Sequence, residues 1–134
     1  MGYLIDSDVL IAAERGLFSL SDFADQLSDI PLAIAAITAS ELLQGVHRAQ
    51  DAARRKQRSE FVEGLFEVFP VVPFDLEVAR IHAEMWAEMQ KQGRMAGAND
   101  LMIAATARML NYGVVTLNEK DFAHIPGLEV VNPL

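Results

Sequence analysis

Short apolar runs alternate with longer amphipathic stretches along this chain. A short, wholly apolar run is typical of a buried strand, whereas apolar positions three or four residues apart are typical of a helix. The apolar runs predict strands at 3–5, 32–36, 71–72, 114–117 and 128–131. The amphipathic stretches predict helices at 9–14, 20–27, 39–49, 51–69, 76–92 and 101–110.

Capping residues mark several ends of these elements. Ser19 or Ser21 can cap the short second helix, and Asp75 can cap the long fifth one. Thr38 is expected to cap the helix at 39–49. The sequence Asn111-Tyr112-Gly113 is expected to close the last helix with a glycine signal.

Strands that alternate with helices indicate an α/β fold. The expected architecture is a mostly parallel central sheet with helices on both faces, joined by right-handed crossovers. A chain of 134 residues is the size of one ordinary domain, and it contains no repeat or linker, so a single domain over 1–134 is expected.

Composition narrows the class of protein. Apolar residues make up 51% of the chain, with six Met and seven Phe, which suggests a surface left for a partner and thus a homodimer or stable complex. Cysteine is absent, so disulfides and thiolate metal ligation are excluded. Neither a secretory signal nor an apolar run long enough to span a membrane is readable, which predicts a soluble cytoplasmic protein without a membrane partner.

Four acidic residues lie beside apolar runs. Asp6 and Asp121 follow predicted strands, whereas Glu41 and Asp100 lie in first helical turns. In an open parallel sheet, the carboxyl ends of the strands and the N-termini of the following helices share one rim. We therefore expect all four carboxylates at that rim.

Each acid also has a local explanation. Asp6, Asp100 and Asp121 can favour helix N-termini, and Thr38 with Glu41 reads as a capping box. These explanations do not account for four like charges at one rim, because crowded carboxylates raise one another's pKa unless a cation intervenes. Mg²⁺ or Mn²⁺ is the natural choice, since these ions prefer oxygen ligands. Such an ion supports hydrolysis of a phosphodiester.

The charge is unevenly distributed. The net charge of −8 does not indicate a nucleic-acid-binding protein, yet five of the eleven basic residues lie within 48–58. The simplest explanation is a solvated helix face, and the alternative is a patch that binds RNA. Arg54, Arg55 and Arg58 are expected to point away from the apolar face of their helix. The candidate RNA-binding residues are Arg48, Arg54, Arg55, Arg58 and Arg94.

Four motifs in order resemble a known family. They are Asp6-Ser7-Asp8, Ser40-Glu41-Leu42-Leu43-Gln44-Gly45, Asn99-Asp100-Leu101-Met102-Ile103-Ala104-Ala105 and Thr116-Leu117-Asn118-Glu119-Lys120-Asp121-Phe122. Together they look like PIN-domain ribonucleases, specifically VapC-type toxins of toxin–antitoxin pairs. The resemblance runs from Tyr3 to about Val131 and implies the PIN three-layer sandwich.

The resemblance also implies particular roles. It assigns Asp6, Glu41, Asp100 and Asp121 to a catalytic metal site. Nearby polar support would come from Asp8, Thr116 and Asn118. It further implies an endoribonuclease that cleaves structured RNA such as tRNA or rRNA, leaving 5′-phosphate and 3′-hydroxyl ends. A homodimer and a small VapB-type antitoxin, whose tail enters the acidic groove, are implied as well.

Two other classes remain open on the sequence alone. The Asp6-Ser7-Asp8 motif also resembles the nucleophile and acid of haloacid-dehalogenase-like phosphatases. That chemistry needs a well-placed lysine to stabilise the phosphoryl group, and the candidate, Lys91, lies in a long helix. The third class is a catalytically inactive PIN-fold interaction module, against which only the complete acidic set argues.

Overall fold

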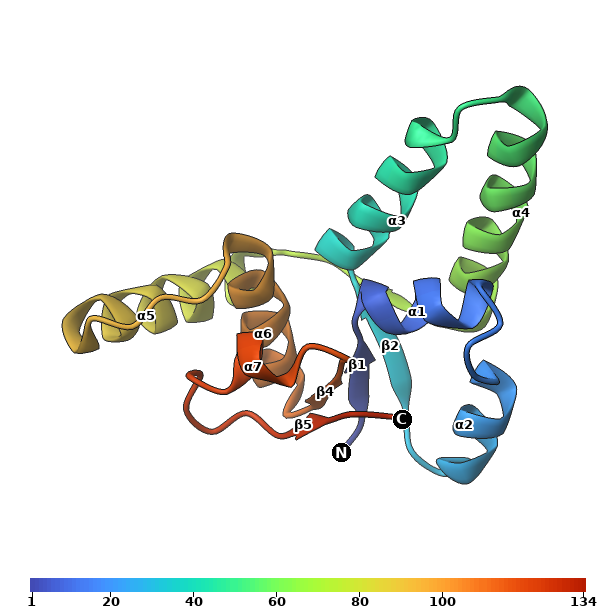
Figure 1. The fold of residues 1–134 in the computed structure, drawn as a ribbon. Coiled ribbons are helices and arrows are strands. Elements are labelled where there is room, and N and C mark those ends of the chain that lie inside the picture. Colours follow the sequence, from blue (N-terminus) through green and yellow to red (C-terminus); the bar gives the residue numbers. More distant parts are fainter.

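Five short parallel strands form the centre of the molecule. The structure is a computed structural model that describes residues 1–134 (Figure 1). The strands, in the spatial order β3-β2-β1-β4-β5, are β1 Tyr3–Ile5, β2 Leu32–Ala35, β3 Val71–Val72, β4 Gly113–Val115 and β5 Val130–Val131. Leu4 of β1 pairs with Ala33 on one side and with Val114 on the other. The predicted parallel sheet is confirmed.

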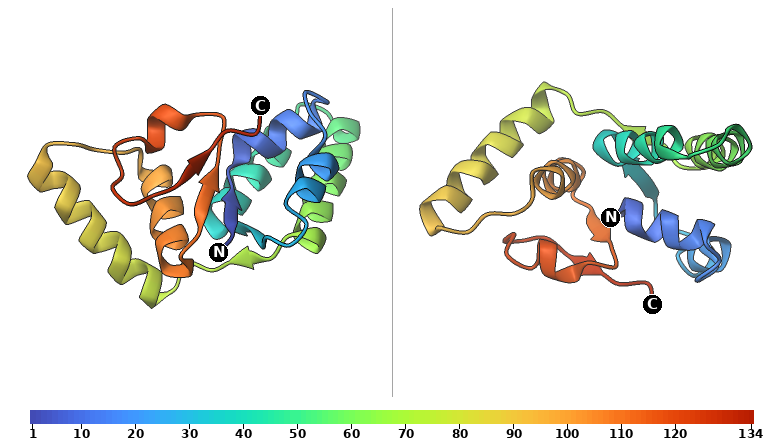
Figure 2. Two further views of the ribbon diagram at one scale, coloured as in Figure 1. Left: turned by 90° about the horizontal axis from the view of Figure 1, so that it is seen from below. Right: turned by 45° about the horizontal axis from the view of Figure 1, so that its top comes forward.

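Seven helices connect and cover these strands. They are α1 Ser7–Glu14, α2 Leu20–Gln26, α3 Ala36–Arg48, α4 Ala52–Val68, α5 Leu76–Gln92, α6 Ala98–Leu110 and α7 Glu119–Phe122. In both views of Figure 2, α5 and α6 lie on one side of the sheet and α1 to α4 on the other. None of the helices is both long and apolar enough to cross a membrane.

The alternation of side chains along the strands produces two cores. Leu4 and Val114 belong to the cluster that packs under α5 and α6, whereas Ile5 and Val115 belong to the cluster under α1 to α4. Successive residues of a strand point to opposite faces, so wholly apolar strands are what a sheet covered on both faces requires. The predicted three layers are confirmed.

Most of the predicted helix ends are confirmed. Ser19 accepts the backbone N–H of Asp22, and Asp75 accepts that of Val78 at 3.0 Å. At the end of α6, however, the left-handed residue is Asn111, with φ 57°, rather than Gly113. Gly113 lies in β4, where a Cβ atom would stand 2.8 Å from the Tyr3 ring. Glycine is therefore required at position 113 because the strands pack closely there, and it does not end the helix.

The prediction for Thr38 was wrong. Helix α3 begins directly at the end of β2, with Ala35 at its N-cap, so Thr38 lies inside the first turn. Thr38 is fully buried and its hydroxyl has no hydrogen-bond partner. The strand leads into the helix without a loop, and this leaves no place for a separate capping residue.

Candidate active site

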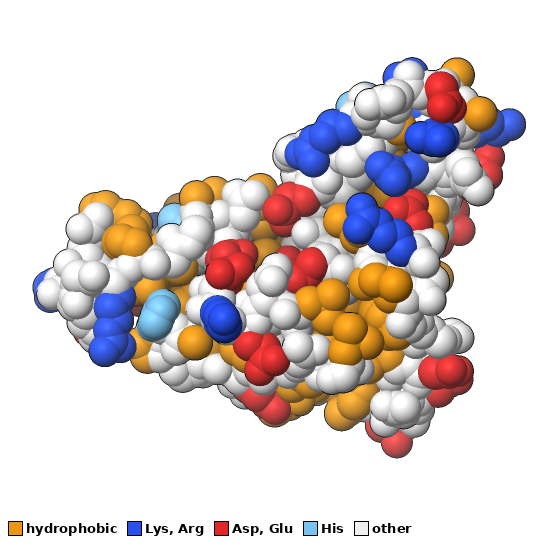
Figure 3. All heavy atoms as spheres, viewed as in Figure 1, with side chains coloured by type: hydrophobic (Ala, Val, Ile, Leu, Met, Phe, Trp, Pro, Cys, Tyr) orange, Lys and Arg blue, Asp and Glu red, His pale blue; other side chains and the backbone are white.

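The carboxyl ends of β1 and β4 define one rim of the sheet. The chain passes from β1 to β2 and β3 in one direction and from β4 to β5 in the other, so these adjacent strands form a topological switch point. Acidic side chains gather in the middle of the face shown in Figure 3. Asp6 and Asp8 follow β1, Asp121 follows β4, and Asp100 lies in the first turn of α6. Glu41 lies in the second turn of α3, so its predicted place in a first helical turn was wrong.

Asp6 caps α1 and is only 7% exposed. Its Oδ1 accepts the Ser7 N–H at 2.8 Å, and its Oδ2 accepts the Thr116 hydroxyl at 2.9 Å. Burial and the charges of Asp8 and Asp100 raise the Asp6 pKa to about 7, although these hydrogen bonds oppose the shift. Asp6 therefore stays ionised at neutral pH only at a cost in free energy.

Asp8 is held from one side only. Its Oδ2 accepts the Asn118 side-chain amide at 2.9 Å and the Thr116 hydroxyl and Leu117 N–H at 3.2 Å each. Its Oδ1 is buried and has no partner. Burial, and secondarily the charge of Asp121, raise the Asp8 pKa. The predicted supporting residues Thr116 and Asn118 thus lie where the sequence analysis expected them.

Asp100 lies close enough to three other acids for their charges to repel its carboxylate. Burial and then the charges of Asp121, Glu41 and Asp8 raise its pKa to about 6. The same carboxylates that follow β1, open α6 and lie in α3 and α7 therefore repel one another across the rim. The expectation that distant acids share one rim agrees with this coupling.

Glu41 does not form the expected capping box. Its Oε1 accepts a long hydrogen bond from the Ser7 hydroxyl at 3.5 Å, and its Oε2 accepts one from the Asn99 amide at 3.3 Å. Because α3 begins at Ala36, with Ala35 rather than Thr38 at its N-cap, Glu41 lies too far along the helix to form a capping box. Ser7 and Asn99 belong to two of the sequence motifs, but neither was predicted as a partner of Glu41 because no local pattern pairs either residue with it.

The rim has the chemistry of a cation site, although its acids are spread apart. No three acidic or histidine side chains are arranged as a ready cluster of metal ligands. Repulsion between carboxylates explains the spacing, and a divalent ion would remove that repulsion. The partnerless Asp8 Oδ1 and the raised pKa values of Asp6 and Asp100 fit such an ion. Hard oxygen donors suit Mg²⁺ or Mn²⁺.

Four of the five predicted RNA-binding arginines lie on or beside α3 and α4. Arg54 pairs with Asp51 at 3.5 Å, Arg55 donates to the Ala49 carbonyl at 3.0 Å, and Arg48 donates to the Gln44 side chain at 3.3 Å. Basic side chains accordingly gather over this part of the molecule in Figure 3. The acidic rim is therefore flanked by a basic surface.

Arg58, although it lies on α4, and Arg94 differ from expectation. Arg58 is not free in solvent: its side chain is 40% exposed, but its guanidinium pairs with Glu14 at 3.5 Å and donates to the Gly45 carbonyl at 3.3 Å. Arg94 follows the C-terminal end of α5, which Figure 1 shows at the opposite side of the molecule from α3 and α4. Arg94 is thus separate from the α3–α4 surface.

Comparison with known proteins agrees with this architecture. The PIN domain family model matches residues 3–128. The chain is 38% identical over 133 residues to Ribonuclease VapC of Rickettsia bellii, with 98% of this chain and 96% of that protein covered. It is 31% identical over 126 residues to the tRNA(fMet)-specific endonuclease VapC of Shigella flexneri, with 94% and 93% covered.

Solved structures give the same result. VapBC2 from Rickettsia felis, bound to a DNA fragment from its promoter, matches with a TM-score of 0.87 at 25% identity and 98% coverage of both chains. VapBC-1 from Haemophilus influenzae matches with a TM-score of 0.84 at 27% identity, covering 99% and 98%. PIN-domain ribonucleases generally depend on a divalent metal. The chain belongs to the PIN-domain family and, within it, to the VapC ribonucleases.

Proposed function

We propose that this protein is a Mg²⁺-dependent endoribonuclease that acts as the toxin of a VapBC-type pair. The observation that carries the proposal is the set of mutually repelling carboxylates at the rim, among which Asp6 has a pKa of about 7 and Asp100 one of about 6. Such a set is costly for the fold and becomes favourable when it holds a divalent ion. Mn²⁺ is the alternative ion.

Asp6, Glu41, Asp100 and Asp121 are the proposed holders of the ion. When bound, it supplies polarisation of the scissile phosphate, activation of a water and neutralisation of the leaving oxyanion. The products would carry 5′-phosphate and 3′-hydroxyl ends. Thr116 fixes the Asp6 carboxylate by the 2.9 Å hydrogen bond, while its hydroxyl also accepts the Asn118 N–H at 3.1 Å. This chain of bonds orients the two acids that follow β1 and flank Ser7.

The proposed substrate is a structured RNA, a tRNA or rRNA, in the cytoplasm. Support comes from the Shigella relative, whose name specifies a tRNA(fMet) endonuclease. Because the net charge is −8, attraction of phosphates depends on local arginines rather than on the whole protein. Arg48, Arg54 and Arg55 lie on the surface of α3 and α4 and are the first candidates. Arg58 and Arg94 are weaker candidates on geometry.

The proposed partners are a VapB-type antitoxin and a second copy of this chain. The VapBC complexes that match the fold support the antitoxin. Exposed apolar side chains near and on α5, namely Phe74, Leu76 and Trp86, support the homodimer. Light scattering of the wild type and Trp86→Glu tests the homodimer, which a monomeric wild type would contradict.

The test of the function is removal of Asp6. Asp6→Ala should abolish cleavage of cellular RNA and growth arrest, because the ion loses its most buried ligand. Asp25→Ala is the matched control, since Asp25 is an exposed carboxylate on α2 away from the rim. Sequencing of RNA ends after induced expression measures activity, and circular dichroism verifies the fold. A folded, fully active Asp6→Ala protein would refute the assignment.

Calorimetry with Mn²⁺ separates the enzyme from an inactive PIN-fold module. The wild type should release heat that Asp6→Ala lacks, whereas an inactive module should show no difference. The phosphatase alternative has lost its support, because the family assignment is to VapC ribonucleases. In addition, Lys91 lies in the last turn of α5, at the outer end of that helix in Figure 1.

A further inference from the structure

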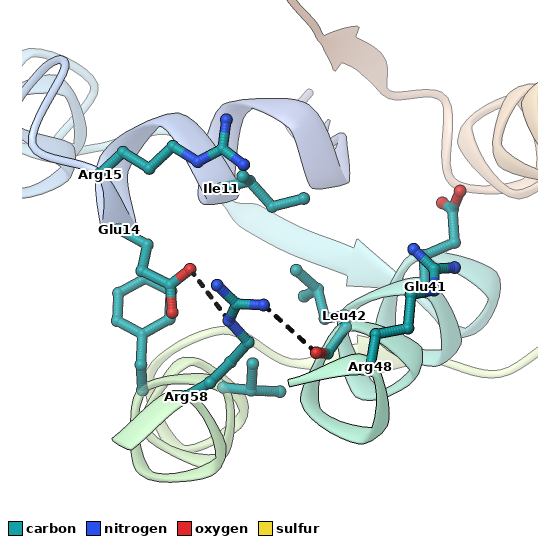
Figure 4. Close-up of a pocket in the computed structure, with 10 residues that line it drawn as sticks. Ile11, Glu14, Arg15, Glu41, Leu42, Arg48 and Arg58 are labelled. Carbon is teal, nitrogen blue, oxygen red and sulfur yellow. Dashed lines mark hydrogen bonds and ion pairs between the residues drawn. The ribbon is translucent and has the colours of Figure 1, made fainter. Parts of the chain in front are cut away.

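A pocket opens beside the acidic rim, between α1, α3 and α4 (Figure 4). Its volume is about 160 Å³. Glu41 forms one end, so the pocket is continuous with the proposed active site. Its apolar floor consists of Ile11, Leu42, Phe61 and Val62.

Arg58 forms a fixed wall of this pocket. Its Nε pairs with Glu14 Oε1 at 3.5 Å and its Nη1 donates to the Gly45 carbonyl at 3.3 Å, as the dashed lines of Figure 4 show. These two partners hold the planar guanidinium in place and satisfy its charge. Arg58 is therefore poorly suited to capture a phosphate but well suited to present a flat, rigid surface.

The arginines at the mouth of the pocket, unlike Arg58, have no carboxylate partner. Arg15 and Arg48 also line it, and neither forms an ion pair. Figure 4 shows Arg15 extending from α1 and Arg48 from α3 on either side of the opening. These two guanidinium groups have no carboxylate partner, so they can attract phosphates, and the apolar floor between them can hold the group that joins those phosphates.

Size and chemistry favour a nucleobase as the occupant. An apolar cavity of about 150 Å³ accommodates a benzene ring, so the pocket is large enough for one planar aromatic group. Unstacked RNA bases pack on aromatic rings and on guanidinium planes, and Phe61 and Arg58 offer one of each. The two arginines at the mouth match the phosphates on either side of such a base.

We propose that this pocket binds one base of the RNA strand close to the scissile bond and thereby sets the sequence preference of cleavage. The proposal rests on the proposed ribonuclease function. It assigns specificity to the floor and to Arg58, and phosphate binding to Arg15 and Arg48. Arg15 was not among the candidates from the sequence.

Gly45 offers a way to fill the pocket without strain. It lies within α3, and a Cβ atom there would meet only Arg58 Cδ, at 3.9 Å. In Gly45→Leu, the leucine side chain should therefore extend into the pocket and fill it. Gly64→Leu is the matched control, because Gly64 is also a helical glycine and a Cβ there meets nothing within 4 Å. Phe61→Leu removes the ring and keeps the floor apolar.

The experiment is digestion with Mn²⁺ of a pool of RNA stem-loops with randomised loops, followed by sequencing of the new ends. The wild type should prefer particular bases at one position near the cut. Gly45→Leu and Phe61→Leu should each flatten that preference by lowering cleavage at the preferred sites about tenfold, roughly the effect of losing one stacked base. Gly64→Leu should retain it, and all variants should bind Mn²⁺ like the wild type.

Other outcomes would contradict the base-binding pocket or the ribonuclease function itself. An unchanged preference in Phe61→Leu and in a Gly45→Leu protein that still binds Mn²⁺ would overturn the proposal, as would a wild type that cuts without any preference. An unchanged preference combined with weaker inhibition by a VapB-type antitoxin would assign the pocket to the protein partner instead. If the wild type cuts no RNA, the proposed function itself fails.

Discussion

Two helix starts in this protein are capped by an aspartate and have opposite consequences, although Asp6 accepts the N–H of the next residue and Asp75 the N–H of the third residue on. Asp6 accepts a backbone N–H at the start of α1, and Asp75 does so at the start of α5. Asp75 is exposed, so water solvates the rest of its carboxylate. Asp6 is buried near two other acids, and its pKa rises to about 7. A capping acid in water stabilises the fold, whereas one at the rim destabilises it.

The largest expected effect is on the pH dependence of stability. Asp6 has a folded pKa of about 7 and an ordinary value of 3.8, so the folded state binds its proton more tightly than the unfolded state. Its stabilising protonation is therefore lost as pH rises toward 7. Between pH 5.5 and 8, metal-free protein should lose about 2 kcal/mol from this group, measured by urea unfolding.

Asp6→Asn is the control for that measurement. Because the amide carries no charge, the variant should lose most of the pH dependence and be more stable than the wild type at pH 8. Saturating Mn²⁺ should restore the wild type at high pH, since binding to the folded state alone stabilises it. A wild type whose stability rises from pH 5.5 to 8 without metal would contradict the raised pKa.

The next effect concerns the hydroxyl that joins the two neighbouring acids. Thr116→Val keeps the shape of a fully buried side chain and removes the donor to Asp6 Oδ2. Loss of an outer partner of a metal ligand typically weakens metal affinity by about 10- to 100-fold. Mn²⁺ calorimetry should show a loss in this range, and urea unfolding should show a loss of stability of about 1–3 kcal/mol because the buried Asp6 Oδ2 loses its donor. Thr116→Ser, which retains the hydroxyl, should bind nearly as well as the wild type.

The sequence pattern predicted that the acidic residues gather at one rim of the sheet, but it did not predict the hydrogen bonds that they form there. Wholly apolar strands at the right spacing are a local signal, so the parallel sheet and the gathering of Asp6 and Asp100 could be anticipated. The partners of Glu41 could not, because Ser7 and Asn99 lie 34 and 58 residues away in the chain. A local capping box was the stronger pattern, and the direct join of β2 to α3 overrode it.

Arg58 illustrates the same limit. Helical periodicity placed it on the solvent face of α4, because one helix considered alone has only one apolar side. In the structure α1 and α3 both lie against that part of α4, and Glu14 supplies a partner from α1. Which neighbours a helix acquires depends on the packing of separate elements, which periodicity within one element does not specify.

A smaller effect is expected at the exposed cap. Asp75→Ala removes the acceptor of the Val78 N–H and should destabilise the protein by about 1 kcal/mol. RNA cleavage and Mn²⁺ affinity should remain at wild-type values. Urea unfolding beside an activity assay measures both. A loss of Mn²⁺ affinity in this variant would erase the distinction between the two helix starts.

The smallest effect is expected at Asn99. Its hydrogen bond to Glu41 Oε2 is long, at 3.3 Å, and Glu41 keeps a second donor in Ser7 at 3.5 Å. Long bonds at a partly exposed carboxylate contribute little on their own. Asn99→Ala should therefore lower Mn²⁺ affinity by less than about tenfold, and the double variant Ser7→Ala with Asn99→Ala should lose more than the sum of the single losses in free energy. Strict additivity would mean that the two donors do not act together in orienting Glu41, and the contrast with the tightly held Asp6 would then rest on burial alone.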